Sequence, residues 1–348
     1  MSQLRLVRRI AEHMVGLAVG AAIIGVVESR YRVHEEGLAA LPVLDPWGVK
    51  FAYRTQLERG RVRGWVHGMA PPAKRPGVQR ILALGDSVTY GLGVEWSESW
   101  PQVLEAELAQ SLDYGQGQAE VYNFAMPGWD AEQSVTLTTS TLGDWQPDLV
   151  VWGSSPNDVL QSYLMWGAND AHPVFVGTSV PDGVSPLPEW LTLFFVRYSS
   201  LMRQWLAGRM AQKQQAGLVL DADMDWYRSQ LARLREWSSQ TGVPVMILAI
   251  PAHTQADPEA CPKWVNEHDC AAQAERYRVL TTELASAGMM WVDGRLAYAA
   301  SGRPHYMLSP GERPGPGAWE NDAEHPTSAG HRALVRGMLA EVKRMLTQ

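Results

Sequence analysis

The sequence predicts an α/β protein built on a five-stranded parallel sheet. From Arg80 onward, short apolar runs alternate with longer helical stretches. In addition, 46% of the residues are hydrophobic and only 19% are charged. The first pattern is typical of alternating strands and helices, and the second supplies enough apolar side chains for a large core. The predicted strands are residues 81–84, 121–125, 149–152, 243–250 and 289–292.

Five helices are expected between and after these strands. Gly242 and Gly288 stand where helix C-terminal caps belong, because glycine readily adopts the left-handed conformation that ends many helices. The elements together predict a flavodoxin-like three-layer α/β/α sandwich with strand order 2-1-3-4-5. The predicted helices are residues 100–111, 131–142, 223–240, 271–287 and 328–346.

One connection is too long for an ordinary loop. Residues 160–221 separate the third and fourth predicted strands, and residues 190–205 within them carry apolar side chains at helical spacing. We therefore predict a helical insertion. It is either an ordinary packing element or a cap over the functional site.

Length and charge limit the class of protein. At about 150 residues per domain, 348 residues correspond to slightly more than two domains, but the motifs described below place a single domain at residues 80–348. The composition excludes a disordered chain. The net charge of −7 argues against binding of nucleic acid phosphates, so no nucleic acid partner is expected.

The first 30 residues combine a basic start with an apolar run. Arg5, Arg8 and Arg9 precede an uncharged run from Met14 to Val27, which as a helix at about 1.5 Å per residue falls somewhat short of the roughly 30 Å bilayer core. A cleaved signal peptide, a buried helix and an uncleaved signal anchor are the three interpretations. We favour the membrane anchor, with the rest of the chain outside the cytoplasm (periplasmic or at the cell surface), because no small-x-small cleavage site follows and the positive charges precede the run.

The lead at residues 31–79 is rich in Pro and Gly and becomes basic toward its end. From Lys50 to Arg80 there are eight basic residues against one acidic residue, Glu58. Such a stretch lies either against anionic lipid head groups or on an acidic surface of the following domain.

The chain has two cysteines, Cys261 and Cys270, separated by a short loop. In an oxidising compartment this pattern predicts one disulfide. The alternatives are two free thiols or a metal pair with His253 and His268. Because no Cys-x-x-Cys spacing is present, metal is the weakest of the three, and no metal or cofactor is expected.

Four short motifs follow predicted strands or precede the last helix. Gly85-Asp86-Ser87 stands at the carboxyl end of the first strand, where open α/β sheets present ligand-facing groups. The second strand leads to Gly128, whose lack of a side chain lets its N–H approach a ligand, and the third leads to Asn157. Near the C-terminus, Asp322 precedes His325 by three residues, a spacing that lets a carboxylate orient an imidazole.

These four blocks, in this order, resemble the SGNH, or GDSL, hydrolase superfamily. The resemblance covers the chain from about Arg80 to its end and implies an SGNH hydrolase fold. It also implies a triad of Ser87 as nucleophile with His325 and Asp322, and an oxyanion hole from the N–H groups of Ser87 and Gly128 and the amide of Asn157. The third block, Gly-Ser-Ser-Pro-Asn-Asp, is longer than the family's usual Gly-x-Asn-Asp.

The expected function is a serine ester hydrolase (esterase, lipase or acylhydrolase) with an acyl-enzyme intermediate, since a serine hydroxyl becomes nucleophilic when a histidine takes its proton. Its substrate is an acyl ester of a lipid or a glycan. One alternative is an O-acyltransferase that moves an acyl group to or from a cell-surface glycan beside a membrane protein partner. Another is a non-catalytic glycan-binding or scaffold protein, against which the intact triad argues.

Tryptophan is unusually frequent, with 15 residues against five phenylalanines. Indole rings suit sites that are apolar at one end and wet at the other. Trp129, Trp152 and Trp319 stand close to the motifs, so we expect them to line the substrate pocket. Plain core filling is the alternative.

Overall fold

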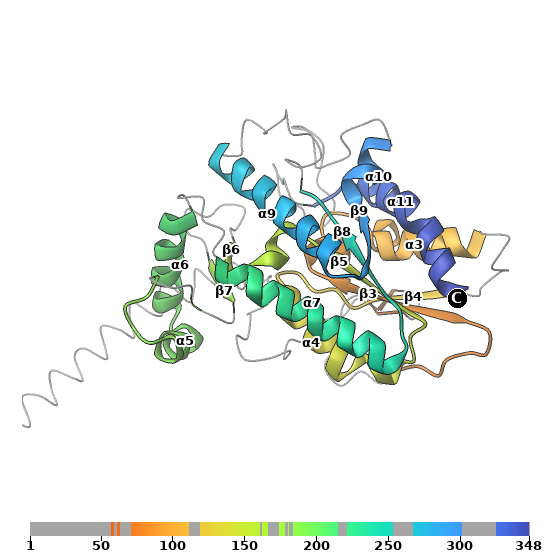
Figure 1. Cartoon of the computed structure of the whole chain (residues 1–348), viewed down its shortest axis with the longest axis horizontal. Coiled ribbons are helices and arrows are strands. Elements are labelled where there is room, and N and C mark those ends of the chain that lie inside the picture. The colour runs from red at the N-terminus through yellow and green to blue at the C-terminus, as the bar shows by residue number, and fades with distance from the viewer. Residues whose placement is uncertain are drawn as a thin grey trace, which may run out of the picture.

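A parallel sheet of five strands forms the centre of the structure (Figure 1). In the computed structural model the strands lie in the order β4, β3, β5, β8, β9, and every neighbouring pair is parallel. In chain order this is 2-1-3-4-5, so the predicted sheet is confirmed. The strands are β3 (Gln79–Gly85), β4 (Ala119–Asn123), β5 (Leu149–Ser154), β8 (Val245–Ala249) and β9 (Met290–Asp293).

The structure describes only part of the chain. Residues 1–30, Cys261, Trp319 and Asp322 lie outside the described residues, as do the side chain of Cys270 and most of the lead at residues 31–79. Among the helices that are described, none is both long and apolar enough to cross a bilayer. The described residues are 57–58, 61–62, 71–110, 119–160, 162–165, 174–177, 180, 184–214, 221–252, 267–300 and 325–347.

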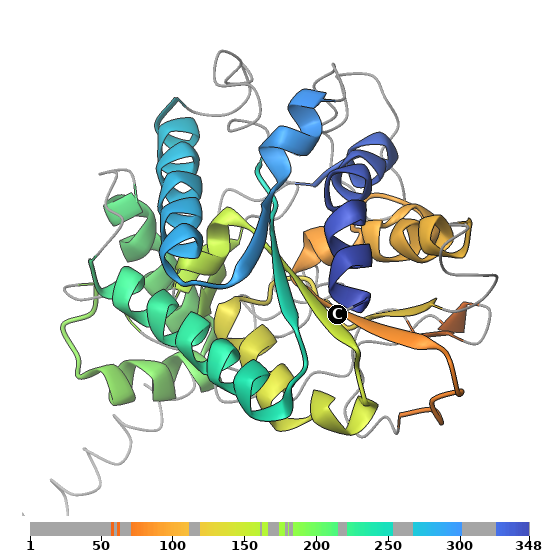
Figure 2. The ribbon, with the colours of Figure 1, turned by 45° about the vertical axis from the view of Figure 1, so that its right-hand side comes forward.

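Helices cover both faces of the sheet (Figures 1 and 2). Along β3, Leu82 and Leu84 pack on one face while Ile81 and Ala83 pack on the other, because successive side chains of a strand alternate. Each face buries its own hydrophobic cluster, which confirms the three-layer arrangement. One face packs against α4 (Ala131–Ser140), α7 (Asp221–Thr241) and α9 (Glu267–Ser286), and the other against α3 (Trp100–Gln110), α10 (Gly294–Ala300) and α11 (Ser328–Leu346).

Helix ends follow local capping chemistry. Gly242 and Gly288 adopt left-handed φ values of 72° and 68° just after α7 and α9, as predicted. The side chain of Thr327 accepts a hydrogen bond from the N–H of Gly330 at 3.3 Å, which fixes the start of α11. Outside the long insertion, sequence periodicity missed α10 and several shorter elements: β1 (Leu57–Glu58), β2 (Arg61–Val62), α2 (Ser87–Tyr90), η1 (Trp96–Glu98), η2 (Leu142–Trp145) and η3 (Pro156–Val159).

The long insertion is only partly helical. It begins with an antiparallel pair, β6 (Ser162–Met165) and β7 (Val174–Gly177), which the sequence analysis did not predict. The predicted helical part follows as α5 (Glu189–Tyr198) and α6 (Ser200–Gln214). These two helices share a small hydrophobic cluster with Val184, which is separate from the two clusters on the central sheet.

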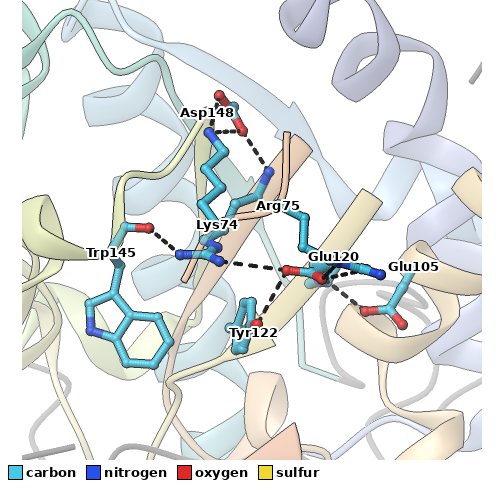
Figure 3. A network of polar contacts seen from close by, with 9 residues as sticks. Lys74, Arg75, Glu105, Glu120, Tyr122, Trp145 and Asp148 are labelled. Atoms are coloured by element: carbon cyan, nitrogen blue, oxygen red, sulfur yellow. Dashed lines mark hydrogen bonds and ion pairs between the residues drawn. The ribbon is translucent and has the colours of Figure 1, made fainter. Parts of the chain in front are cut away.

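The end of the basic lead packs on acidic side chains of the domain (Figure 3). The Nζ atom of Lys74 lies 2.6 Å from Oδ2 of Asp148, and Nη2 of Arg75 lies 2.6 Å from Oε1 of Glu120. Arg80 is fully buried at the start of β3, with its Nη2 3.7 Å from Oε2 of Glu120. For these three residues, the structure shows the packing on an acidic surface that was one of the two interpretations of the lead.

Candidate active site

An open cavity lies at the carboxyl ends of β3, β5 and β8, the edge at which parallel α/β sheets bind ligands. Ser87 reaches it from the turn after β3, and Asn157 reaches it from η3 after β5. Two residues that the sequence analysis assigned to one site therefore face the same space. The described residues that line the cavity are Asp86, Ser87, Val88, Ser155, Pro156, Asn157, Ile250, Pro251, Ala252 and Arg276.

Ser87 and His325 form a hydrogen-bonded pair at this edge. The Nε2 atom of His325 lies 2.7 Å from Oγ of Ser87. His325 precedes α11, whose position is fixed because Nδ1 of the buried His331 accepts a hydrogen bond from the N–H of Trp100 at 3.2 Å. A ring nitrogen at 2.7 Å from a hydroxyl is within reach of its proton, which is the geometry that activates a serine.

Asp86 holds the turn that carries Ser87. Its Oδ1 accepts a hydrogen bond from the N–H of Val88 at 2.9 Å and caps α2. Burial raises the pKa of the Asp86 carboxyl, although the Val88 N–H and the charge of His325 oppose that shift. The sequence analysis gave Asp86 no role. The available signal was an aspartate one residue before a short helix, a common capping position.

Two glycines let α2 approach the sheet closely. Gly85 of β3 and Gly153 of β5 are partners in the parallel register. A methyl group on Gly85 would lie 2.5 Å from Oγ1 of Thr89, and one on Gly153 would overlap the same atom. The turn that carries Ser87 therefore needs glycine at both positions to seat Thr89 of α2 against the sheet.

The loop that carries Gly128 is tied to the turn that carries Ser87. The N–H of Met126 donates to the carbonyl of Gly85 at 3.0 Å, and Nδ2 of Asn123 donates to the carbonyl of Thr89 at 2.9 Å. Gly128 itself has a φ of 80°, a left-handed conformation that favours glycine. Asn123 is a second residue that the sequence analysis did not single out as part of the site.

Two more buried aspartates close the other turns of the site. Oδ2 of Asp158 accepts a hydrogen bond from the N–H of Ser155 at 2.8 Å and closes the turn that presents Asn157. Oδ1 of Asp130 accepts from the N–H of Gln133 at 3.1 Å where the Gly128 loop enters α4. Burial, and next the negative charge of Asp86, raise the pKa of Asp158 well above its usual range. Burial raises the pKa of Asp130 to about 7.

Replacing Asp130 with asparagine is expected to remove part of the pH dependence of stability. Because its pKa rises from 3.8 to about 7 on folding, the folded state keeps a proton that the unfolded state has already lost. The wild type therefore loses stability as the pH rises from about 4 to about 7, by roughly 2 to 4 kcal/mol. Asparagine still caps α4 without this loss. Urea unfolding of both proteins at acidic and neutral pH measures the difference, and equal pH dependence would contradict the prediction.

Two tryptophans predicted to line the pocket lie in the core instead. Trp129 and Trp152 are fully buried in the cluster that also contains Leu82 and Leu84, and neither lines the cavity beside Ser87. The prediction was wrong for both because closeness to a motif in the sequence does not determine the side of the sheet to which an indole points. Trp319, the third, lies outside the described residues, together with Asp322 and the Cys261–Cys270 pair.

The described residues contain no group of three or more His, Cys, Asp or Glu side chains that could hold a metal ion. His331, the one histidine described besides His325 and His268, packs α11 against α3 as noted above. The described site presents a hydroxyl next to an imidazole, with a side-chain amide on the same cavity.

The fold and the site define a class of protein, an α/β enzyme with a Ser–His pair at the carboxyl edge of a parallel sheet. Residues 83–333 match the model of the GDSL-like lipase/acylhydrolase family. This match spans most of the chain, and the chain belongs to this family. It is accordingly an ester-hydrolysing enzyme.

Several solved structures resemble the chain at low sequence identity. TesA is 17% identical, with 77% of this chain and 99% of that chain covered and a TM-score of 0.42. The acetyl xylan esterase AlAXEase is 15% identical, with coverages of 76% and 99% and a TM-score of 0.44. Axe2, an acetylxylan esterase from Geobacillus stearothermophilus, is 14% identical, with coverages of 76% and 94% and a TM-score of 0.42. A comparison with curated proteins found no significant match.

Proposed function

We propose that this chain is a serine ester hydrolase that acts through an acyl-enzyme on Ser87. The observation that carries the proposal is the 2.7 Å distance between Nε2 of His325 and Oγ of Ser87. As Oγ attacks the carbonyl carbon of an ester, Nε2 takes the hydroxyl proton and the carbonyl oxygen becomes negatively charged. We assign Asp322 the role of orienting the His325 ring, because it precedes this histidine by three residues.

The negative oxygen needs hydrogen-bond donors that are already in place. We assign these to the N–H groups of Ser87 and Gly128 and to the side-chain amide of Asn157. When the tetrahedral intermediate collapses, the ester C–O bond breaks and His325 returns the proton to the leaving alcohol. Water then attacks the acyl group on Ser87, gives a proton to His325 and releases the acid, after which the serine recovers its proton.

Labelling with a fluorophosphonate probe tests the nucleophile, because such probes form a covalent bond with an activated serine. We expect the wild type to be labelled and Ser87→Ala to remain unlabelled. Ser155 lines the same cavity, so Ser155→Ala is a matched control that should still react. An unlabelled wild type, or equal labelling of Ser87→Ala, would overturn the proposal.

The substitution Asn157→Ala is expected to lower kcat by about 100- to 1,000-fold with little change in KM, because the Asn157 amide acts on charge that develops only in the transition state. The matched control is Asp158→Asn in the same turn. Burial raises the pKa of Asp158 well above its usual range, and an asparagine oxygen can still accept from the N–H of Ser155, so we expect activity close to wild type. Steady-state kinetics with a chromogenic acetate ester measures both, and an equal loss in the two variants would contradict the assignment.

The acyl-enzyme is common to hydrolysis and to acyl transfer, so the acceptor needs its own measurement. We propose water as the acceptor. With an acylated glycan as donor and a second glycan present, the expected product is the free acid. Accumulation of an acylated second glycan in its place would show an acyltransferase.

A further inference from the structure

We infer that α5 and α6 dock on an anionic membrane surface through an exposed aromatic patch. The patch consists of Trp190, Phe194 and Phe195 on α5 and Trp205 on α6. Five large hydrophobic side chains are exposed within the described residues, and the patch contains four of them. Their exposed fractions are 67% for Trp190, 51% for Phe194, 40% for Phe195 and 38% for Trp205. This inference concerns where the enzyme sits, so it goes beyond the proposed ester hydrolysis.

One side of α5 exposes aromatic rings, and its buried side holds both an apolar residue, Val196, and a polar one. Thr192, a polar residue, is completely buried and shares a hydrogen bond of 2.8 Å with Oγ of Ser185. Trp190 and Phe194, four residues apart and therefore on one side of the helix, are exposed. A helix whose outward side is aromatic and whose inward side contains a buried hydroxyl is built for an apolar environment on its outside.

The buried contact between α5 and α6 is made by other residues than the patch. Val196 of α5 packs with Leu206 and Met210 of α6 in the small cluster described above, and none of the four aromatic residues belongs to it. Figure 1 shows α5 and α6 at one end of the molecule, with β6 and β7 between them and the central sheet. None of their described residues lines the cavity beside Ser87.

Charge favours a lipid surface over a second copy of this chain. From Glu189 to Gln214 the sequence of α5 and α6 contains four basic residues and one acidic residue. The same segment of a second copy would bring like charge to a symmetric contact, whereas an anionic headgroup brings opposite charge. Helices that combine Trp and Phe with basic residues bind at the headgroup boundary, where the rings enter the acyl region and the cations meet anionic lipids. The aromatic patch and the local positive charge together fit phosphatidylglycerol-like headgroups.

The test uses the full chain and phosphatidylcholine–phosphatidylglycerol vesicles whose acyl chains carry bromine, which quenches nearby tryptophan fluorescence. The variant Trp190→Phe, Trp205→Phe keeps the patch apolar but removes its two fluorophores. We expect it to lose a measurable part of the quenching that the wild type shows. This difference reports on the patch itself, whatever other segment holds the chain to the vesicle.

A second variant, Phe194→Ser, Phe195→Ser, leaves both tryptophans in place and removes two apolar rings. We expect the quenching assigned to Trp190 and Trp205 to fall by roughly threefold or more, and to fall similarly when phosphatidylglycerol is omitted. Leu296→Ser is the matched control, because Leu296 is exposed on α10, and it should behave as wild type. Hydrolysis of a soluble ester by each variant checks that the domain is folded.

Two results would overturn the inference. The first is quenching of the Trp190→Phe, Trp205→Phe variant equal to that of the wild type. The second is a Phe194→Ser, Phe195→Ser variant with unchanged quenching but altered self-association by sedimentation, which would assign the patch to a second copy of the chain.

Discussion

Replacing His325 with alanine is expected to lower kcat for ester hydrolysis by about 10⁴- to 10⁶-fold. Without the imidazole 2.7 Å from Oγ of Ser87, the hydroxyl loses the base that takes its proton, and a neutral hydroxyl is a weak nucleophile. Hydrolysis of p-nitrophenyl acetate by purified His325→Ala measures the loss. Urea unfolding of the same sample shows whether the variant is folded.

The double variant Ser87→Ala, His325→Ala distinguishes a working pair from two independent contributions. When two residues act as a unit, removing either one already removes their joint contribution to the rate. We therefore expect the double variant to be no slower than either single variant. A multiplied loss in the double variant, or near-normal activity in His325→Ala, would contradict the pairing that the geometry indicates.

The largest expected effect on stability is that of Arg80→Met, which should destabilise the fold by about 3 to 5 kcal/mol. The guanidinium of Arg80 donates to the carbonyl of Trp145 at 2.8 Å and lies against Glu120. Methionine fills part of the same volume but leaves the carbonyl without this donor and Glu120 without its buried partner. Urea unfolding at neutral pH measures the change.

Arg75→Met is the matched control, because Arg75 pairs with the same carboxylate from the surface. Its side chain is 65% exposed, whereas that of Arg80 is 1% exposed. Water screens the exposed guanidinium of Arg75, and the Glu120 carboxylate keeps Arg80 and Tyr122 as partners when Arg75 is lost, so we expect less than about 1 kcal/mol. Similar losses in both variants would show that burial is not what makes Arg80 important.

Much of the fold could be predicted because the central strands and their helices are long and regular. All five strands of the sheet and the C-terminal caps at Gly242 and Gly288 were predictable from apolar periodicity and glycine placement, and the strand order was expected from the flavodoxin-like fold class. The pair β6 and β7 was not, because two four-residue strands in a long insertion leave too short a pattern to distinguish from loop.

The hydrogen-bonded pair of the site was also predictable, but its supporting residues were not. Ser87 and His325 belong to motifs that occur in a characteristic order along the chain, so both could be assigned to one site from the sequence. The roles of Asp86, Asp130 and Asp158 depend on burial and on which N–H each carboxylate meets after folding. The same reason explains the error at Trp152, since the direction of a side chain relative to the sheet depends on the packing of the helices above it.

The sequence by itself determined the strands of the sheet and the residue types at its carboxyl edge, because periodicity and motif spacing are local properties of the chain. Only the tertiary structure decided where the charges and the aromatic rings lie. Arg80 belongs to a basic stretch in the sequence, yet it is buried because Glu120 and the Trp145 carbonyl, from distant segments, meet its guanidinium. Trp152 and Trp190 are the same residue type, but Trp152 is buried in a cluster with residues of α4 and α7, whereas Trp190 lies at the surface. Burial depends on contacts between segments that are far apart in the chain.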